Sequence, residues 1–182
     1  MVSRVNISAS GTKALAQKLK RAKESLQVGW FSDVSYQDGT PVAGIAALNE
    51  YGTSTSPARP FFRPAIESNN STWADTFAAG AKSWLNGSTE YSVVLNGVGL
   101  QAQADVKTAI VSGNHAPLSP VTLALRRLKN QGVPIGRGVV GAVASAVAQG
   151  KTGAGELGAP FANQDPLRDT GYMISTLTYE VS

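Results

Sequence analysis

The sequence predicts an α+β fold in which a small antiparallel or mixed sheet packs against two or more long helices, with a Gly/Ala-rich projecting arm. Three features predict it. An alternating segment lies near each end of the chain, two long segments with helical apolar spacing lie between them, and residues 133–160 are rich in glycine, alanine and valine without a clean period. The 182 residues suffice for one core, so we expect a single domain over 1–182, with 133–160 as a long loop or arm.

A helix and two strands are expected at the ends of the chain. Apolar residues recur at helical spacing over 13–25, and a hydroxyl of the preceding Ser10-Gly-Thr12 is expected to cap this helix. Alternation over 26–31 predicts an early strand, and alternation over 177–181 predicts a late one. We expect these two strands to pair in one sheet.

Turn and capping residues organise the next part of the chain. Asp38-Gly39 is a turn signal. Pro41 suits the first turn of a helix, and Gly52 is expected to end it. The segment Arg59-Pro-Phe-Phe-Arg-Pro64 should be extended or turned, because each residue before a proline avoids the helical region.

Further helices are expected beyond this segment. Apolar residues at helical spacing predict two long helices over 64–85 and 91–111, the second weakened by two glycines. Ser119 is expected to cap another helix that runs from Pro120 to Asn130.

The sequence lacks the residue clusters that catalysis would need. It has no cysteine and a single histidine, His115, so thiolate, Ser–His and zinc chemistry have no ready residues. The carboxylates are scattered, with no close acidic pair of the kind that hydrolases use. Gly136-Arg-Gly138-Val-Val-Gly141 matches a dinucleotide fingerprint, but the segment before it is too short for a buried strand. We therefore expect no enzyme, no cofactor and no metal.

The chain is mildly basic, with a net charge of +4 and a pI near 9.5. Such charge favours contact with nucleic acid or with an acidic protein face, and solvated helix faces are the plainer explanation. The chain start has no signal-peptide core, and the most apolar run is about half a membrane span, so we expect no membrane partner. The basic residues form two clusters: Lys13, Lys18, Lys20, Arg21 and Lys23, then Arg126, Arg127 and Lys129.

Several segments together resemble a known family. They include Val28-Gly-Trp-Phe31, Tyr36-x-Asp38-Gly-Thr-Pro-Val-Ala43, Ala47-Leu-Asn-Glu-Tyr-Gly-Thr53, Pro57-Ala-Arg-Pro-Phe-Phe-Arg-Pro-Ala65, Leu118-Ser-Pro-Val-Thr-Leu-Ala-Leu-Arg-Arg127, Pro166-Leu-Arg-Asp-Thr-Gly171 and Leu177-Thr-Tyr-Glu-Val181. In this order they resemble the tail-completion, or virion-morphogenesis, family of tailed bacteriophages, found at the head–tail neck. The segment 133–160 departs from the family's pattern.

The resemblance implies a structural virion protein that is assembled in the host cytoplasm and forms a ring, expected to be a hexamer, on the tail axis. Such a ring completes or terminates the tail and joins it to the head connector. The expected partners are other copies of the chain, head-completion or connector proteins, and the tail tube or tail terminator protein. Genomic DNA would pass the lumen without being read in sequence. The alternatives are a minor tail or head-completion protein of the same particle, or a basic nucleic-acid-binding module.

The segment 59–64 has the properties of an interface. Its restricted backbone loses little entropy on docking. We expect one phenylalanine in the core and one near an interface, while the two arginines bind carboxylates, including that of the nearby glutamate in the same or a neighbouring subunit. The predicted interface residues here are Glu50, Tyr51, Arg59, Phe61, Phe62 and Arg63.

The segment 133–160 is the second predicted contact, as a loop or arm with one short helix or hairpin around 139–148. Small side chains and low charge permit close backbone contact, and assembly would cover an apolar arm that is a hazard in a monomer. The residues expected to touch a neighbouring subunit are Val139, Val140 and Val143.

Overall fold

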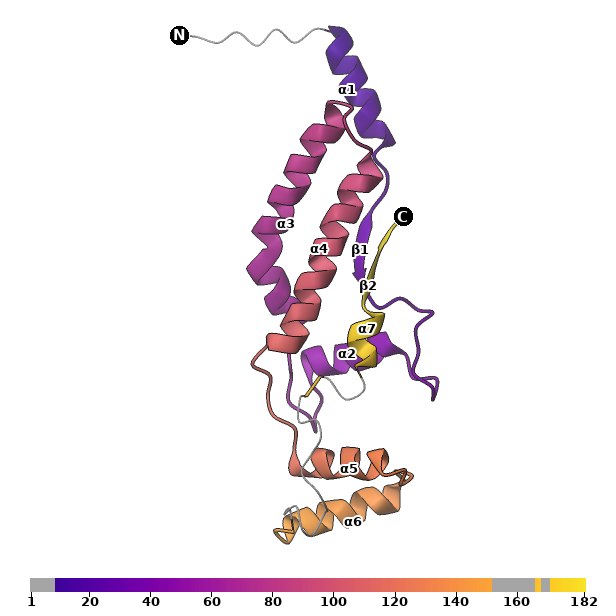
Figure 1. The fold of residues 1–182 in the computed structure, drawn as a ribbon, viewed down its shortest axis with the longest axis vertical. Helices are drawn as coiled ribbons and strands as arrows, with labels where there is room; N and C mark the ends of the chain where they lie inside the picture. Colours follow the sequence, from indigo (N-terminus) through magenta and orange to yellow (C-terminus); the bar gives the residue numbers. More distant parts are fainter. Residues whose placement is uncertain (1–8, 152–165, 168–170) are drawn as a thin grey trace. The chain divides into compact units, whose positions relative to one another are not determined.

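The computed structural model describes residues 9–151, 166–167 and 171–182 of the chain, and it is α+β (Figure 1). The predicted fold class is confirmed, since a two-stranded antiparallel sheet packs with helices in the described residues. The helices are α1 (Ala9–Arg21), α2 (Val42–Tyr51), α3 (Phe62–Leu85), α4 (Tyr91–Ser112), α5 (Pro120–Asn130), α6 (Arg137–Ala148) and α7 (Tyr172–Thr176). The strands are β1 (Leu26–Gly29) and β2 (Thr178–Val181).

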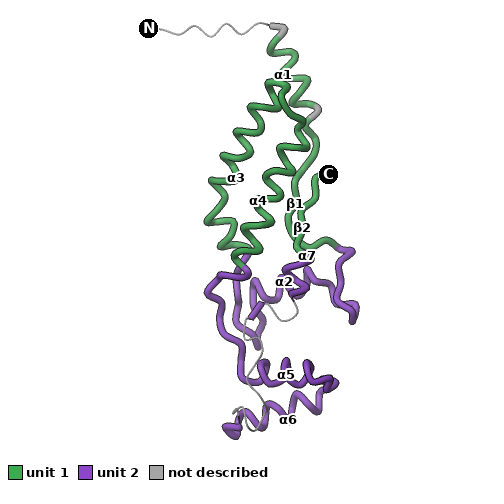
Figure 2. Tube along the Cα trace, viewed as in Figure 1, with its two compact units in different colours: residues 1–31, 62–109, 177–182 green, residues 32–61, 110–176 purple. Residues whose placement is uncertain are grey.

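The chain divides into two compact units, each built from segments distant in the sequence (Figure 2). The sheet unit comprises 1–31, 62–109 and 177–182 and holds α1, α3, most of α4 and both strands. The helical unit comprises 32–61 and 110–176 and holds α2, α5, α6 and α7.

The sheet joins the two predicted terminal strands. β1 pairs antiparallel with β2, with Leu26 opposite Val181 and Gly29 opposite Thr178. Two backbone hydrogen bonds extend the ladder, from Ser25 N–H to the Ser182 carbonyl at 2.6 Å and from Ser182 N–H to the Ser25 carbonyl at 3.0 Å. The predicted pairing is therefore confirmed, although β1 ends at Gly29, two residues before the predicted end.

The long helices α3 and α4 pack side by side and antiparallel (Figure 1). The Trp73 indole N–H donates to Asp105 Oδ2 at 2.7 Å, which joins the middle parts of α3 and α4. Where α3 ends and α4 begins, the Trp84 and Tyr91 rings lie 4.9 Å apart between centroids. The buried face of α4 supplies much of the sheet unit's core: Val94, Leu95, Val98, Ala102 and Val106.

Gly99 lets the sheet approach α4 closely. A Cβ atom at this position would come 2.7 Å from Leu26 Cδ1 and 2.8 Å from Tyr179 Cγ. Both distances are too short for real contacts, so only glycine leaves room for these two side chains. The Gln103 amide adds a bond to the Leu177 carbonyl at 2.6 Å, next to β2. A glycine that weakens the helix thus permits helix–sheet packing.

The structure corrects two predicted helix starts. The segment Ser10-Gly-Thr12 lies inside α1, so it does not cap that helix. Helix α3 begins at Phe62, so residues 62–64 are helical and not extended as predicted. Pro64 is the third residue of α3, where a backbone N–H would have no acceptor within the helix. A residue before proline normally avoids the helical conformation. Here the packing of the first turn of α3, in which Ala65 is buried, outweighs that preference.

The short helix expected around 139–148 is present as α6, which covers residues 137–148 and packs against α5. The glycines of α6 each cost about 1 kcal/mol relative to alanine, but burial of Val143 favours the helix. Residues 152–160 of the predicted arm lie outside the described residues.

Gly99→Ala should lower the free energy of unfolding by about 1–2 kcal/mol, because overpacking against Tyr179 and Leu26 exceeds the helix-propensity gain. Gly97→Ala is the matched control, since no atom lies within 4 Å of its added Cβ, and it should stabilise by about 0.5–1 kcal/mol. Urea unfolding followed by circular dichroism measures both. Equal stabilisation by the two substitutions would contradict the packing role of Gly99.

Candidate functional site

A folded-back loop follows α2 in the helical unit. Gly52 ends α2 with φ of 75°, a left-handed conformation that favours glycine. An added Cβ there would meet the Ala58 nitrogen at 2.7 Å, because the chain returns over this position. Two backbone bonds close the loop, from Thr53 N–H to the Ser56 carbonyl at 2.8 Å and from Arg59 N–H to the Asn49 carbonyl at 2.7 Å.

Glu50 holds the far end of this loop from inside the unit. Its side chain is buried, and Oε2 accepts the Phe61 N–H at 2.8 Å. Phe61 is itself only 1% exposed. A charged acceptor on a buried backbone N–H makes a strong hydrogen bond, and losing it would leave the N–H unsatisfied. Glu50 therefore serves the loop's backbone within the subunit.

Arg59 ties the loop to the segment that precedes α5. Its side chain is 7% exposed, and its Nε and Nη2 donate to the Ala116 and Pro117 carbonyls at 2.7 and 3.0 Å. Burial lowers the pKa of the Arg59 guanidinium, and the positive charge of Arg126 lowers it further. The group remains charged at neutral pH, as arginine does in proteins.

The predicted interface residues separate by exposure. Those that build the interior are Glu50, Arg59, Phe61 and Val143. Phe62 and Val139 are half-buried, and the Phe62 ring lies 6.5 Å from Trp30 between centroids. Those at the surface are Tyr51, Arg63 and Val140. The expectation of one phenylalanine in the core is met by Phe61, and the contacts expected of the surface residues remain predictions.

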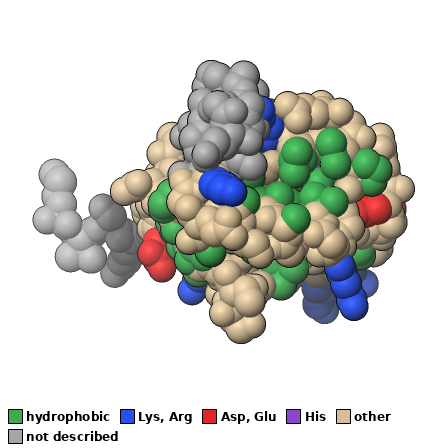
Figure 3. Space-filling view, turned by 90° about the horizontal axis from the view of Figure 1, so that it is seen from below, with side chains coloured by type: hydrophobic (Ala, Val, Ile, Leu, Met, Phe, Trp, Pro, Cys, Tyr) green, Lys and Arg blue, Asp and Glu red, His purple; other side chains and the backbone are tan. Residues whose placement is uncertain are grey.

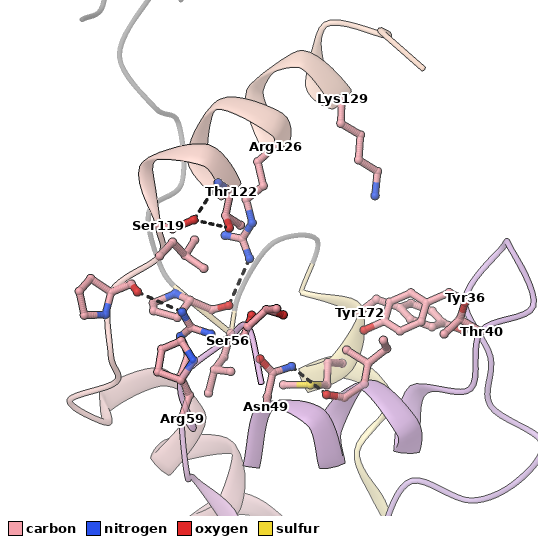
Figure 4. A pocket seen from close by; sticks show the side chains of 18 of the residues that line it. Tyr36, Thr40, Asn49, Ser56, Arg59, Ser119, Thr122, Arg126, Lys129 and Tyr172 are labelled. Carbon is pink, nitrogen blue, oxygen red and sulfur yellow. Dashed lines mark hydrogen bonds between the residues drawn. The ribbon is translucent and has the colours of Figure 1, made fainter. Parts of the chain in front are cut away.

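A cavity of about 750 Å³ lies within the helical unit, to which all of its lining residues belong. One wall is a single face of α5 (Figure 4). The Ser119 hydroxyl at the start of this wall caps α5 by accepting the Thr122 N–H at 3.1 Å, as predicted. The cavity-lining residues of this face that are labelled in the figure are Ser119, Thr122, Arg126 and Lys129.

The facing wall comes from α2 and the folded-back loop, with Asn49, Ser56 and Arg59 (Figure 4). Tyr36 and Tyr172 add an aromatic wall, with ring centroids 5.2 Å apart. The Tyr172 hydroxyl donates to the Ser35 carbonyl at 3.1 Å and so holds α7 to the turn region. The cavity thus combines polar, cationic and aromatic walls from segments far apart in the sequence.

Asp38 is the only carboxylate among the described residues that line the cavity. Its Oδ1 accepts the Thr40 N–H at 2.9 Å in the predicted Asp38-Gly39 turn. This bond and the Thr40 side chain hold the pKa of Asp38 below its usual value, and Lys129 contributes in the same direction. Three cations line the same cavity, Arg59, Arg126 and Lys129, so the described part of the lining has a net positive charge.

The outer face of α6 is apolar and exposed. The sequence from Gly138 to Gly150 carries no charged residue. Val143 is buried, whereas Val140 is 40% exposed, and Ala144 and Ala148 are exposed one and two turns further along. Figure 3, which looks at the molecule from the end where α6 lies, shows hydrophobic side chains gathered on this face.

Helix α4 carries a second exposed apolar stripe, in the sheet unit. Val93 and Leu100 are 58% and 60% exposed, and Gly97 and Ala104 between and beyond them are exposed as well. The alternating steps of four and three residues place all of these positions on one face of the helix. This spacing is visible in the sequence and is the signal that could have identified the stripe.

Comparisons with known proteins identify no relative. No family model matches the chain, and no curated protein or solved structure matches it either. Among the described residues, no group of three or more His, Cys, Asp or Glu side chains is placed to hold a metal ion. No described helix has the length and hydropathy needed to cross a membrane.

Glu50→Ala should lower the free energy of unfolding by about 1–3 kcal/mol, because the buried Phe61 N–H loses its acceptor. Glu67→Ala on the exposed surface of α3 is the control, and its effect should stay within about 0.5 kcal/mol. Chemical denaturation gives both values. If the two variants are equally stable, the Glu50 carboxylate does not hold the loop.

Proposed function

We propose that this chain is a structural subunit of the head–tail neck of a tailed bacteriophage, which assembles with copies of itself into a ring that completes or terminates the tail. The observation that carries the assembly is the exposed, uncharged outer face of α6. The placement at the neck rests on the sequence resemblance.

The composition of α6 supports a partner on its outer face. A helix that is apolar all round is normally buried on all sides. Here one side packs against α5, while Val140, Ala144 and Ala148 are exposed on the other. A second copy of the chain would remove this apolar area from water, at about 25 cal/mol per Å².

A closed ring requires contact between two different surfaces of the subunit, because a head-to-tail interface repeats around the ring. The α6 face belongs to the helical unit, and the α4 stripe of Val93, Gly97, Leu100 and Ala104 belongs to the sheet unit. Two unlike apolar surfaces on one chain fit this requirement. An isologous dimer would need only one of them.

The folded-back loop also supports a role in contacts. Tyr51 is 68% exposed beside it, and residues 53–58 are all exposed. The buried groups of Glu50 and Arg59 order the loop before any partner arrives, so docking costs little conformational entropy. Exposed tyrosine on ordered backbone is typical of interface centres. The resemblance rests in part on these same residues.

One contact weakens the alternative of a basic nucleic-acid-binding module. Lys18 Nζ donates to the Leu85 and Trp84 carbonyls at 2.8 and 3.3 Å, at the end of α3. Both carbonyls lie in the last turn of α3, where the helix itself supplies no N–H donor, and the Trp84 carbonyl also accepts the Gly87 N–H at 2.9 Å. Part of the N-terminal basic cluster thus has a structural use within the sheet unit.

Purified protein should form oligomers, with rings visible by negative-stain electron microscopy and a matching mass by light scattering. Ala144→Glu places a charge on the outer α6 face and should weaken self-association roughly tenfold or more, while the subunit stays folded. Ala74→Glu, at an exposed position of α3, is the matched control and should assemble normally. A protein that stays monomeric at its highest soluble concentration, or an Ala144→Glu variant that still forms rings, would count against the proposal.

A further inference from the structure

The cavity of the helical unit has a surplus of positive charge in a partly buried place. Arg59 is only 7% exposed, and its guanidinium donates to the neutral carbonyls of Ala116 and Pro117. Arg126 lies close enough to lower the pKa of Arg59, which means that the two cations repel each other. Asp38, the one carboxylate among the described lining residues, accepts the Thr40 N–H within its own turn. An incoming anion would relieve this repulsion.

From this arrangement we infer that the cavity is a receptor for an acidic peptide segment of a partner protein. The inference does not depend on ring formation, because every lining residue belongs to the helical unit of one chain. The carboxylates of the segment would bind Arg126 and Lys129 on the α5 wall. Charge-assisted bonds to arginine are among the stronger polar contacts in proteins.

The size and the walls of the cavity favour a peptide. A volume of about 750 Å³ falls in the range of clefts that enclose ligands. The aromatic pair of Tyr36 and Tyr172 and the side chains of Leu167 and Met173 offer apolar walls beside the cations. The hydroxyls and amide of Thr122, Ser56 and Asn49 supply further polar contacts. Side chains of both characters, acidic and apolar, would therefore find matching surfaces.

Duplex nucleic acid fits the same cations less well. Its phosphates run along a broad, continuous backbone and are best met by basic residues on an open surface. In this chain Arg59 is buried and Arg126 is half-buried, and Arg126 points toward the folded-back loop across the cavity (Figure 4). A recessed site of this kind binds a peptide segment that is narrow enough to enter it. The apolar walls also have no counterpart in a phosphate backbone.

The test measures how immobilised full-length protein retains two pools of short fluorescent peptides. One pool mixes glutamate and aspartate with leucine and phenylalanine in random order, and the other has glutamine and asparagine in place of the acids. The acidic pool should be retained at least roughly tenfold more strongly, because only its carboxylates can form charge-assisted hydrogen bonds with Arg126 and Lys129. Equal retention of the two pools would overturn the inference.

Two sets of variants locate the binding. Arg126→Gln with Lys129→Gln should abolish most of the retention of the acidic pool. Arg137→Gln with Lys151→Gln removes the same charge from exposed positions outside the cavity and should leave retention unchanged. Lys129→Gln alone should cause a smaller loss while leaving the bond from Arg126 Nη2 to the Pro166 carbonyl, 3.2 Å long, in place. Equal losses in the double variant and its control would show only non-specific charge attraction and would refute the assignment.

A duplex oligonucleotide is used as a competitor, to test whether nucleic acid binds the same cavity as the acidic peptides. It should fail to displace the retained acidic peptides at moderate salt. Displacement that depends on Arg126 and Lys129 would assign the cavity to phosphate and overturn the peptide inference. Melting temperatures of all variants, followed by circular dichroism, show that each remains folded before its binding is compared.

Discussion

The candidate site depends on two buried polar side chains that bind backbone groups. Glu50 accepts the Phe61 N–H, and Arg59 donates to the carbonyls before α5. Burying charged groups is costly, and here each is compensated by hydrogen bonds to backbone that would otherwise be unsatisfied. Because these three bonds join residues distant in the sequence, they hold α2, the folded-back loop and the approach to α5 in one arrangement. The exposed loop and the cavity both follow from that arrangement.

The described surface separates into parts with different physical character. The outer face of α6 and the α4 stripe are apolar and have no charged side chain that would distinguish one partner from another. Such surfaces are suited to contacts between identical subunits. The cavity combines cations with aromatic walls and so can discriminate by charge. A protein that acts through assembly needs surfaces of the first kind, and recognition of a separate partner needs one of the second.

Local signals in the sequence predicted most elements correctly. Asp38-Gly39, Gly52 and Ser119 act over a few residues, and each occupies the turn or cap expected of it. At 62–64 a local preference competed with packing. A residue before proline disfavours the helical conformation, yet these residues form the first turn of α3, in which Ala65 is buried.

The sequence alone determined the α+β class, the pairing of its terminal strands and most helix boundaries. These features depend on apolar periodicity and capping residues, which are local to each segment. It also marked 59–64 as a stiff segment, but it did not show which side chains face inward. Only the tertiary structure placed Arg59 and Phe61 inside, left Tyr51 outside, and brought Arg59 opposite Arg126 across a cavity. Those outcomes depend on contacts between residues far apart in the chain, and their energies are set by burial that no local pattern specifies.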